Sequence, residues 1–199
     1  DFATALQQYQ TVAQTATGTT LYQAQLRAAA CQYSLGEFVN AAKTMLDYSL
    51  PTEETWKARF LIYRIQLARQ VADLYSPTLQ TREIVGSTNP EQWTANQWHA
   101  QMEQDFESLW ALRTHLIKLP ISQETFILTV TDTDTQRIPT LFDFVVNEWV
   151  HFLTAGNNPV SSVPVRTYLD KTAVALPADQ ARVDKLADIL QMAYEQIGR

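Results

Sequence analysis

The stretch from Ile138 to Leu153 reads IPTLFDFVVNEWVHFL, and it decides the fold. Pro139 ends any preceding helix, Thr140 is suited to the N-cap position, and Asp143 places a carboxylate near the positive helix end. A helix is therefore predicted to begin here. Its apolar face is made of Phe142, Val145, Val146, Trp149, Phe152 and Leu153, with Phe144 and Val150 beside it. Little circumference is left for water, so we expect neighbours to cover this helix on most sides.

Length and composition favour a domain with a real core. The chain has 199 residues, of which 46% are hydrophobic, so a core can form without metal or disulfide support. Charged residues make up 18%, below the usual value of about 25%, and the net charge is -6 with the 15 basic residues scattered. Surfaces that follow phosphates or anionic lipids need clustered basic residues. We therefore expect no nucleic-acid partner and no direct membrane contact by this segment.

The single cysteine and the start of the chain limit the interpretation further. Cys31 has no partner for an internal disulfide, and we expect it to pack as a small hydrophobic side chain. The chain begins at Asp1 without a Met or signal peptide, and no run reaches about 18 consecutive apolar residues. We interpret residues 1–199 as a single helical domain that is a fragment of a larger protein. Two sub-units are considered: helical hairpins over 1–75 and a helical bundle over 90–199.

The first third of the chain predicts antiparallel helices. Apolar residues recur at helical spacing from Phe2 to Val12, a second helix is expected to close at Gly36, and a third to run from Phe38 to Tyr48. The turn and packing positions of a tetratricopeptide unit match Gly36, Phe38, Ala41 and Met45, with Ala29 at the close-contact site. The terminal proline is two residues early, and Tyr48 replaces a small residue. A generic helical hairpin remains an alternative.

The remaining segments also predict helices. A long helix opens at Thr52 with an apolar stripe of Trp56, Phe60, Tyr63, Leu67, Val71 and Leu74. After a connection over 76–89, an amphipathic helix runs to Pro120 and carries Trp98, Met102, Phe106, Leu109, Leu112 and Leu116. We expect a polar loop over 131–137, irregular chain after Ala155, and a final helix over 178–197 with Val183, Leu186, Leu190, Ala193 and Ile197 inward. The predicted fold class is all-α, with stacked antiparallel helical hairpins forming a tetratricopeptide-like solenoid or an irregular bundle.

Motifs that carry chemistry are sparse. Glu148 and His151 have the Glu-x-x-His spacing of a helical di-iron site, but that site needs a second such pair and two further glutamates. His99 and His115 lack a glutamate three positions earlier, and a hydrogen bond from His99 to Glu103 is the simplest reading of that pair. The sequence has no zinc-protease helix, nucleophile elbow or glycine-rich phosphate loop. We therefore expect no catalytic residue, no metal and no cofactor.

Two tryptophans are candidate interface residues. Trp93 lies at the entry to the long amphipathic helix, and Trp110 lies off its main stripe. Exposed tryptophans frequently anchor protein partners. The alternative is that both cover the ends of the core.

The run Arg137-Ile138-Pro139-Thr140-Leu141-Phe142-Asp143-Phe144, with the helix to Leu153, resembles a segment in the helical N-terminal region of large bacterial alpha-2-macroglobulin-like proteins. That family shows Arg-Pro-Thr-Leu-Tyr-Asp-Phe-Leu before an apolar helix ending in aromatic residues. Leu119-Pro120 and the Trp93-Thr94 approach also look similar, and the order of parts matches over 50–155. Here Ile138 intervenes after the arginine, and Val146, Asn147 and Glu148 replace small and basic positions.

This resemblance implies an extracytoplasmic location, in the periplasm or at the cell surface, in a large protein whose relatives trap peptidases. Cys31 is followed by Gln32 and Tyr33, so the Cys-x-Glu-Gln thioester motif of many members is absent. Our leading hypothesis is a non-catalytic helical domain that scaffolds or recruits a protein or peptide partner and contacts other domains of the same chain. The alternative is a free-standing tetratricopeptide-like adaptor. An enzyme that uses Glu148 and His151 ranks last.

Overall fold

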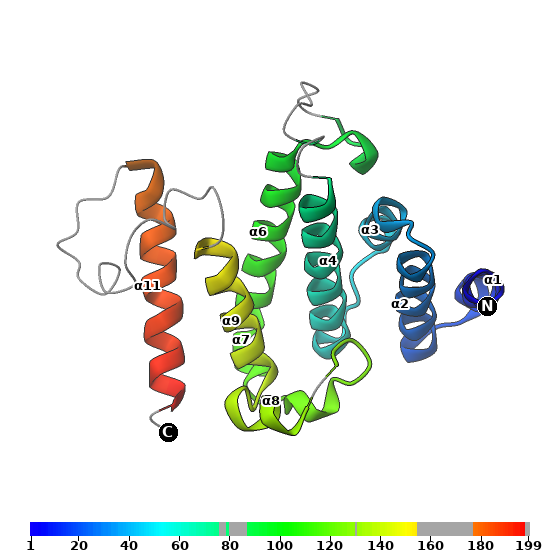
Figure 1. Cartoon of the computed structure of the whole chain (residues 1–199). Helices are drawn as coiled ribbons and strands as arrows, with labels where there is room; N and C mark the ends of the chain where they lie inside the picture. Colours follow the sequence, from blue (N-terminus) through cyan, green and yellow to red (C-terminus); the bar gives the residue numbers. More distant parts are fainter. Residues whose placement is uncertain (76–78, 80–86, 130, 155–176, 198–199) are drawn as a thin grey trace. The chain divides into compact units, whose positions relative to one another are not determined.

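The computed structural model describes residues 1–75, 79, 87–129, 131–154 and 177–197, and it confirms the all-α fold class (Figure 1). Within this described part there is no strand, and an isolated antiparallel bridge joins Pro120 to Thr140. The chain groups into two units, Asp1–Leu116 and Ile117–Arg199. The division falls after Leu116 rather than between 75 and 90, because the helix that follows residue 90 packs against the long helix that precedes it.

The first unit is a series of helices, each packed on its neighbours. It contains α1 (Phe2–Thr15), α2 (Gly18–Ser34), α3 (Phe38–Asp47), α4 (Glu54–Leu74), the 3-10 turn η1 (Pro90–Gln92), α6 (Ala95–Ala111) and α7 (Arg113–Leu116). Helix α1 packs on α2, α2 on α3 and α4, and α4 on α3, α6 and α7. Figure 1 shows this succession from α1 to α6. These contacts are those of stacked helical hairpins.

Helix α1 forms as predicted but buries none of its residues. The Asp1 carboxylate accepts a hydrogen bond from the backbone N–H of Thr4 at 2.9 Å and so caps the helix. Of its apolar side chains, Phe2 is 55% exposed and Val12 is 40% exposed. The predicted apolar stripe is therefore present, although α2 covers it only in part.

The hairpin of α2 and α3 is held together by small side chains. Gly36 ends the connection after α2 with a φ of 81°, a conformation that favours glycine. Ala29 and Ala41 are completely buried, which permits close approach of the two helices. Cys31 is buried, as expected for a small hydrophobic residue. Phe38 is half-buried, and its ring makes an edge contact with Tyr33 at a centroid distance of 5.0 Å.

Helix α4 is covered on most sides in the first unit. Its buried residues are Trp56, Ala58, Phe60, Leu61, Ile62, Ile65, Leu67, Ala68 and Val71. This set is broader than the predicted stripe because α2, α3, α6 and α7 all pack on the helix. The prediction was wrong for Leu74, which is exposed in the last turn.

Helix α6 begins at a capping box, in which Thr94 and Gln97 each accept a backbone N–H from the other. All six residues of the predicted stripe from Trp98 to Leu116 are buried. The helix nevertheless does not run unbroken towards Pro120. It ends at Ala111. The C-cap Leu112 donates its N–H to the Leu109 carbonyl three residues back, and the chain continues as the separate short helix α7.

The second unit contains the 3-10 turn η2 (Ile121–Gln123), α8 (Asp132–Arg137), α9 (Leu141–Thr154) and α11 (Pro177–Ile197). Two backbone bonds, from Ile121 to Pro139 and from Leu141 to Leu119, join the segments that precede η2 and α9. The expectation of a polar loop over 131–137 is wrong. The N–H of Thr135 donates to the Thr131 carbonyl, and Arg137 lies in the last turn, where a cation favours the helix dipole.

The deciding stretch forms α9 as predicted. The Asp143 carboxylate accepts from the Thr140 hydroxyl at 2.6 Å and from its N–H at 3.0 Å, and the Asp143 N–H donates to the Thr140 hydroxyl at 3.3 Å. The buried residues are Leu141, Phe142, Val145, Val146, Trp149 and Leu153, while Phe144, Val150 and Phe152 are half-buried. Thr140 is therefore the N-cap, and the apolar face is confirmed except that Phe152 is less covered than expected.

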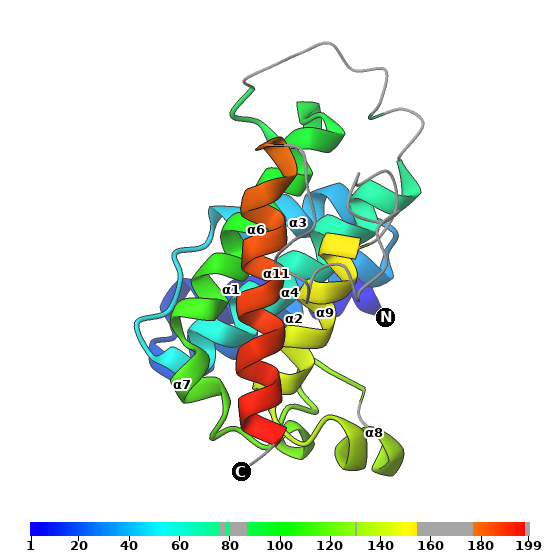
Figure 2. The same cartoon turned by 90° about the vertical axis from the view of Figure 1, so that its left-hand side faces the viewer.

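Helix α11 packs beside α9, as Figure 2 shows. Leu186 and Ile189 are buried, and the Lys185 ammonium lies 5.3 Å from the centroid of the Trp149 ring. The final helix was predicted with nearly these bounds, although Ile189 was not named. Leu190 and Ala193 are half-buried. The side chains of Val183 and Ile197, and most of the connections over 76–86 and 155–176, lie outside the described residues.

Candidate functional site

Trp93 is part of the packing at the start of α6. It is half-buried, its indole Nε1 donates to the Ser87 carbonyl at 2.9 Å, and its ring contacts Trp98 edge-on with centroids 4.8 Å apart. The indole therefore holds the segment before α6 against the helix. A role as an interface anchor stays a prediction for this residue.

Trp110 is also half-buried. The Arg113 guanidinium lies 5.5 Å from its ring centroid and donates to the Trp110 carbonyl at 3.0 Å. Both tryptophans thus have partners within the first unit, and their interface role remains a prediction.

The large apolar side chains that are exposed lie elsewhere. In the first unit they are Phe2, Val12, Tyr33, Leu35, Leu74 and Tyr75. Two belong to α1, and two lie at or just after the end of α2. We call Phe2 and Val12 the α1 apolar pair. The helical period indicated that these two are apolar positions, but it carried no information on what covers them.

The predicted Glu-x-x-His pair does not gather further ligands. Glu148 is half-buried and His151 is exposed on α9. In the described part of the chain, no group of three or more His, Cys, Asp or Glu side chains is arranged to hold a metal ion.

A hydroxyl, an imidazole and a carboxylate meet where α7 packs on the start of α4. The Thr55 Oγ1 lies 2.9 Å from Nε2 of His115, and Nδ1 of His115 lies 3.2 Å from Oε2 of Glu54. We call Thr55, His115 and Glu54 the His115 relay. Thr55 is half-buried, and the side chains of His115 and Glu54 are 28% and 59% exposed.

The break between α6 and α7 positions the imidazole of the relay. The N–H of His115 bonds to the Leu112 carbonyl at 2.9 Å, so the break at Leu112 starts the turn that carries His115 to α4. The hydroxyl and the imidazole are 60 residues apart in the sequence. Sequence reasoning missed the relay because no local spacing connects the two segments, and it predicted a continuous helix at the break.

A second polar cluster lies between α4 and α6. Nε of Arg64 is 3.1 Å from Oδ2 of Asp105, and Nε2 of Gln101 donates to Oδ1 of Asp105 at 3.1 Å. Asp105 is 2% exposed. Burial raises the pKa of this carboxyl to about 6, although Arg64 and the Gln101 hydrogen bond favour its charged form. Desolvation therefore outweighs the partners of Asp105.

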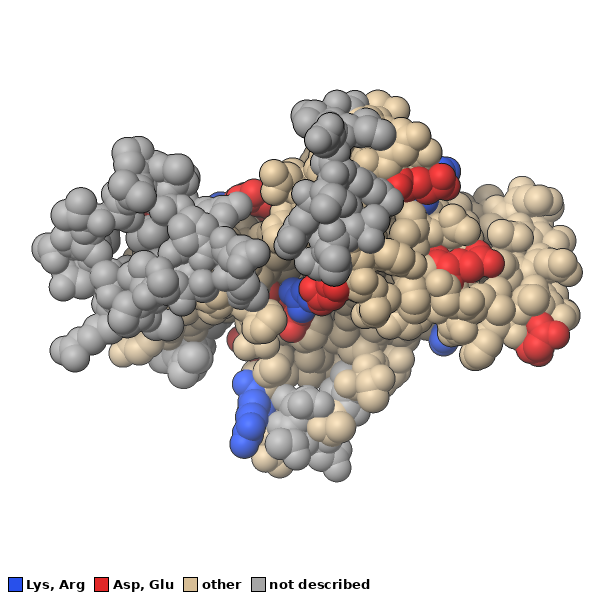
Figure 3. All heavy atoms as spheres, turned by 45° about the horizontal axis from the view of Figure 1, so that its top comes forward, with Lys and Arg blue, Asp and Glu red and all other residues tan. Residues whose placement is uncertain are grey.

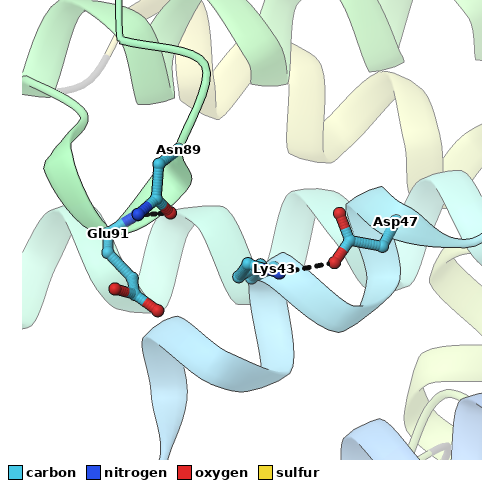
Figure 4. A network of polar contacts seen from close by, with 4 residues as sticks. All are labelled: Lys43, Asp47, Asn89 and Glu91. Atoms are coloured by element: carbon cyan, nitrogen blue, oxygen red, sulfur yellow. Dashed lines mark hydrogen bonds and ion pairs between the residues drawn. The ribbon is translucent and has the colours of Figure 1, made fainter.

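Charged side chains on the surface stand in small, separate groups. On the face shown in Figure 3, neutral residues make up most of the described surface. Figure 4 shows Lys43 of α3 bonded to Asp47 one turn later at 2.7 Å, while the Asn89 side chain accepts the Glu91 N–H beside them. The hydrogen bond to Asp47 raises the pKa of Lys43, and the nearby charge of Glu91 acts in the same direction. Such exposed pairs contribute little to stability.

Comparisons with protein-family models, with curated proteins and with solved structures gave no match to this chain. No helix in the described part is both long and apolar enough to cross a membrane.

Proposed function

We propose that this chain is a helical scaffold and protein-interaction domain of a large, extracytoplasmic alpha-2-macroglobulin-like protein. The resemblance over Arg137–Leu153 supports the family, and the stacked helices of the first unit support the scaffold role. The role requires no metal, cofactor or chemical step. The partner is another domain of the same larger chain.

The observation that carries this proposal is the exposure of α1. Helix α1 packs on α2, yet none of its 14 residues is fully buried and it carries Phe2 and Val12 at the surface. An apolar helix face that its neighbour covers only in part is the kind of surface on which a second helix or a peptide can dock. An intramolecular partner would meet this surface at a high effective concentration, so a small apolar contact would suffice.

The experiment first reads the parent gene for β-sandwich domains and then measures binding of those domains to residues 1–199 by biolayer interferometry. We expect binding that Phe2→Asp and Val12→Asp each weaken by roughly 10-fold or more, because each introduces a charge into an apolar contact. Gln8→Asp is the matched control, since Gln8 is an exposed polar residue of the same helix. Equal affinity for all three variants, or no binding by the wild type, would refute the proposal.

A free-standing tetratricopeptide-like adaptor is the second candidate. The turn at Gly36 and the burial of Ala41 and Met45 agree with the tetratricopeptide positions. The parent gene separates the two candidates, because an adaptor needs no β-sandwich domains in the same chain.

A further inference from the structure

We propose that the His115 relay is a nucleophilic site in which Thr55 accepts the acyl group of a small activated carboxylic ester. The evidence is the order of the contacts: hydroxyl to Nε2, and Nδ1 to carboxylate, at 2.9 and 3.2 Å. This is the arrangement in which a hydroxyl, a general base and an orienting acid act as a unit. The site is separate from the α1 apolar pair and does not depend on the proposed scaffold role.

The carboxylate determines the tautomer of the imidazole. An ionised Glu54 can only accept hydrogen bonds, so the Nδ1 of His115 that faces it carries the proton. In the neutral ring, Nε2 then has a free lone pair and accepts from the Thr55 hydroxyl. In this tautomer the hydrogen bond points in the direction that proton transfer from Thr55 to His115 requires.

The start of α4 holds the hydroxyl in place. Thr55 is the second residue of the helix, and its β-branched side chain has few rotamers. Glu53 is the N-cap, but its side chain makes no capping hydrogen bond. The first backbone N–H groups of a helix have no carbonyl partner within the helix, and the helix dipole is positive there. In the proposed reaction we assign stabilisation of the developing oxyanion to these N–H groups.

The proposed reaction has two balanced steps. In the first, Thr55 Oγ1 bonds to the carbonyl carbon, its proton moves to Nε2 of His115, and the bond to the leaving alcohol breaks as that alcohol receives the proton. The product is an ester of Thr55. In the second, His115 takes a proton from water, the resulting hydroxide attacks the ester, and Thr55 recovers its proton as the carboxylic acid is released.

Exposure limits the class of substrate. Because Thr55 is half-buried and Glu54 is largely exposed, the reacting hydroxyl is close to solvent. A short acyl group with a good leaving group fits such an open position better than a long chain that needs a deep pocket.

The test uses the whole chain with p-nitrophenyl acetate, measuring p-nitrophenolate release and locating the acetyl group by peptide mass spectrometry. We expect acetylation of Thr55, and a rate at least about 100-fold lower in Thr55→Val and His115→Gln, since each removes a reacting group. Glu54→Gln should lower the rate less, because it removes only the orienting charge. The control His151→Gln removes an exposed imidazole of α9 and should leave the rate unchanged.

Thr55→Ser guards against loss of folding as the cause of an inactive variant. It keeps the hydroxyl and removes one methyl group, so we expect a rate at least equal to that of the wild type. Helical circular dichroism is measured for every variant. The proposal is overturned if acetyl groups appear on lysines alone, if Thr55→Val reacts as fast as the wild type, or if folded Thr55→Ser is inactive.

Discussion

Helices α4 and α1 are both amphipathic in sequence, yet α4 lies in the core whereas α1 lies largely exposed at the surface. Phe60 of α4 is fully buried, whereas Phe2 of α1 is 55% exposed. Helix α4 has neighbours in α2, α3, α6 and α7, whereas α1 packs mainly on α2. The period of apolar residues therefore identifies which side of a helix is apolar, but the number of neighbours decides how much of that side leaves water.

The largest effect is expected in the core of α4. Phe60→Ala should lower the free energy of unfolding by about 3–5 kcal/mol, because it removes a fully buried ring and leaves a cavity. Urea denaturation followed by circular dichroism measures the change. A loss below about 1 kcal/mol would mean that α4 is not the best-packed helix of the first unit.

In the second unit, Trp149→Ala tests the buried face of α9 with the same expected loss.

The buried carboxyl of Asp105, between α4 and α6, should give the next largest effect on the free energy of unfolding. The pKa of Asp105 is raised from 3.8 to about 6 by burial, so the folded state favours the protonated carboxyl. The contribution of the protonated Asp105 carboxyl to the free energy of unfolding is fully present below pH about 4. It is lost as the pH rises through about 6, and the total loss is about 3 kcal/mol. As the pH rises from 4 to 8, the wild type should therefore lose stability relative to Asp105→Asn. Urea denaturation of both proteins across this range measures the difference. A constant difference would contradict the raised pKa.

A smaller effect on the free energy of unfolding is expected at the start of α6, the helix that packs against α4. Thr94→Ala removes the capping box and should lower the free energy of unfolding by about 1 kcal/mol, while Thr94→Ser should retain most of the stability. Thermal and urea denaturation measure both variants. Equal stability of Thr94→Ala and wild type would show that packing alone determines where α6 begins.

The smallest effect is expected on α1. Phe2→Ala should change the free energy of unfolding by less than about 0.5 kcal/mol, because the ring is already largely in water. Amide hydrogen exchange should be faster in α1 than in α4, since no α1 side chain is buried. A large loss of stability, or equal protection of the two helices, would remove the contrast between them.

Local sequence signals predicted many of the helix boundaries. They failed where composition or apolar spacing did not reflect the backbone conformation. Thr140 with Asp143 marked the start of α9 because capping depends on residues only three positions apart. The segment over 131–137 was expected to be a loop because it is polar, yet it forms α8. The break at Leu112 was missed because the apolar spacing continues through it to Leu116.

The candidate site was the least predictable part. Trp93 and Trp110 were selected by residue type, and each makes contacts inside the first unit that sequence spacing does not reveal. Thr55 and His115 belong to segments 60 residues apart, so only the packing of α7 on α4 brings them together.

By itself, the sequence determined the all-α class and the apolar faces of α6 and α9, since helix propensity, capping and the 3.6-residue period act within a few residues of one another. Only the tertiary structure decided that α4 is covered on most sides, that α1 stays exposed and that Thr55 meets His115. These outcomes depend on contacts between distant segments. Such contacts form because removing apolar surface from water is favourable wherever two surfaces pack closely. Whether two distant segments pack closely depends on the folded structure and not on local spacing.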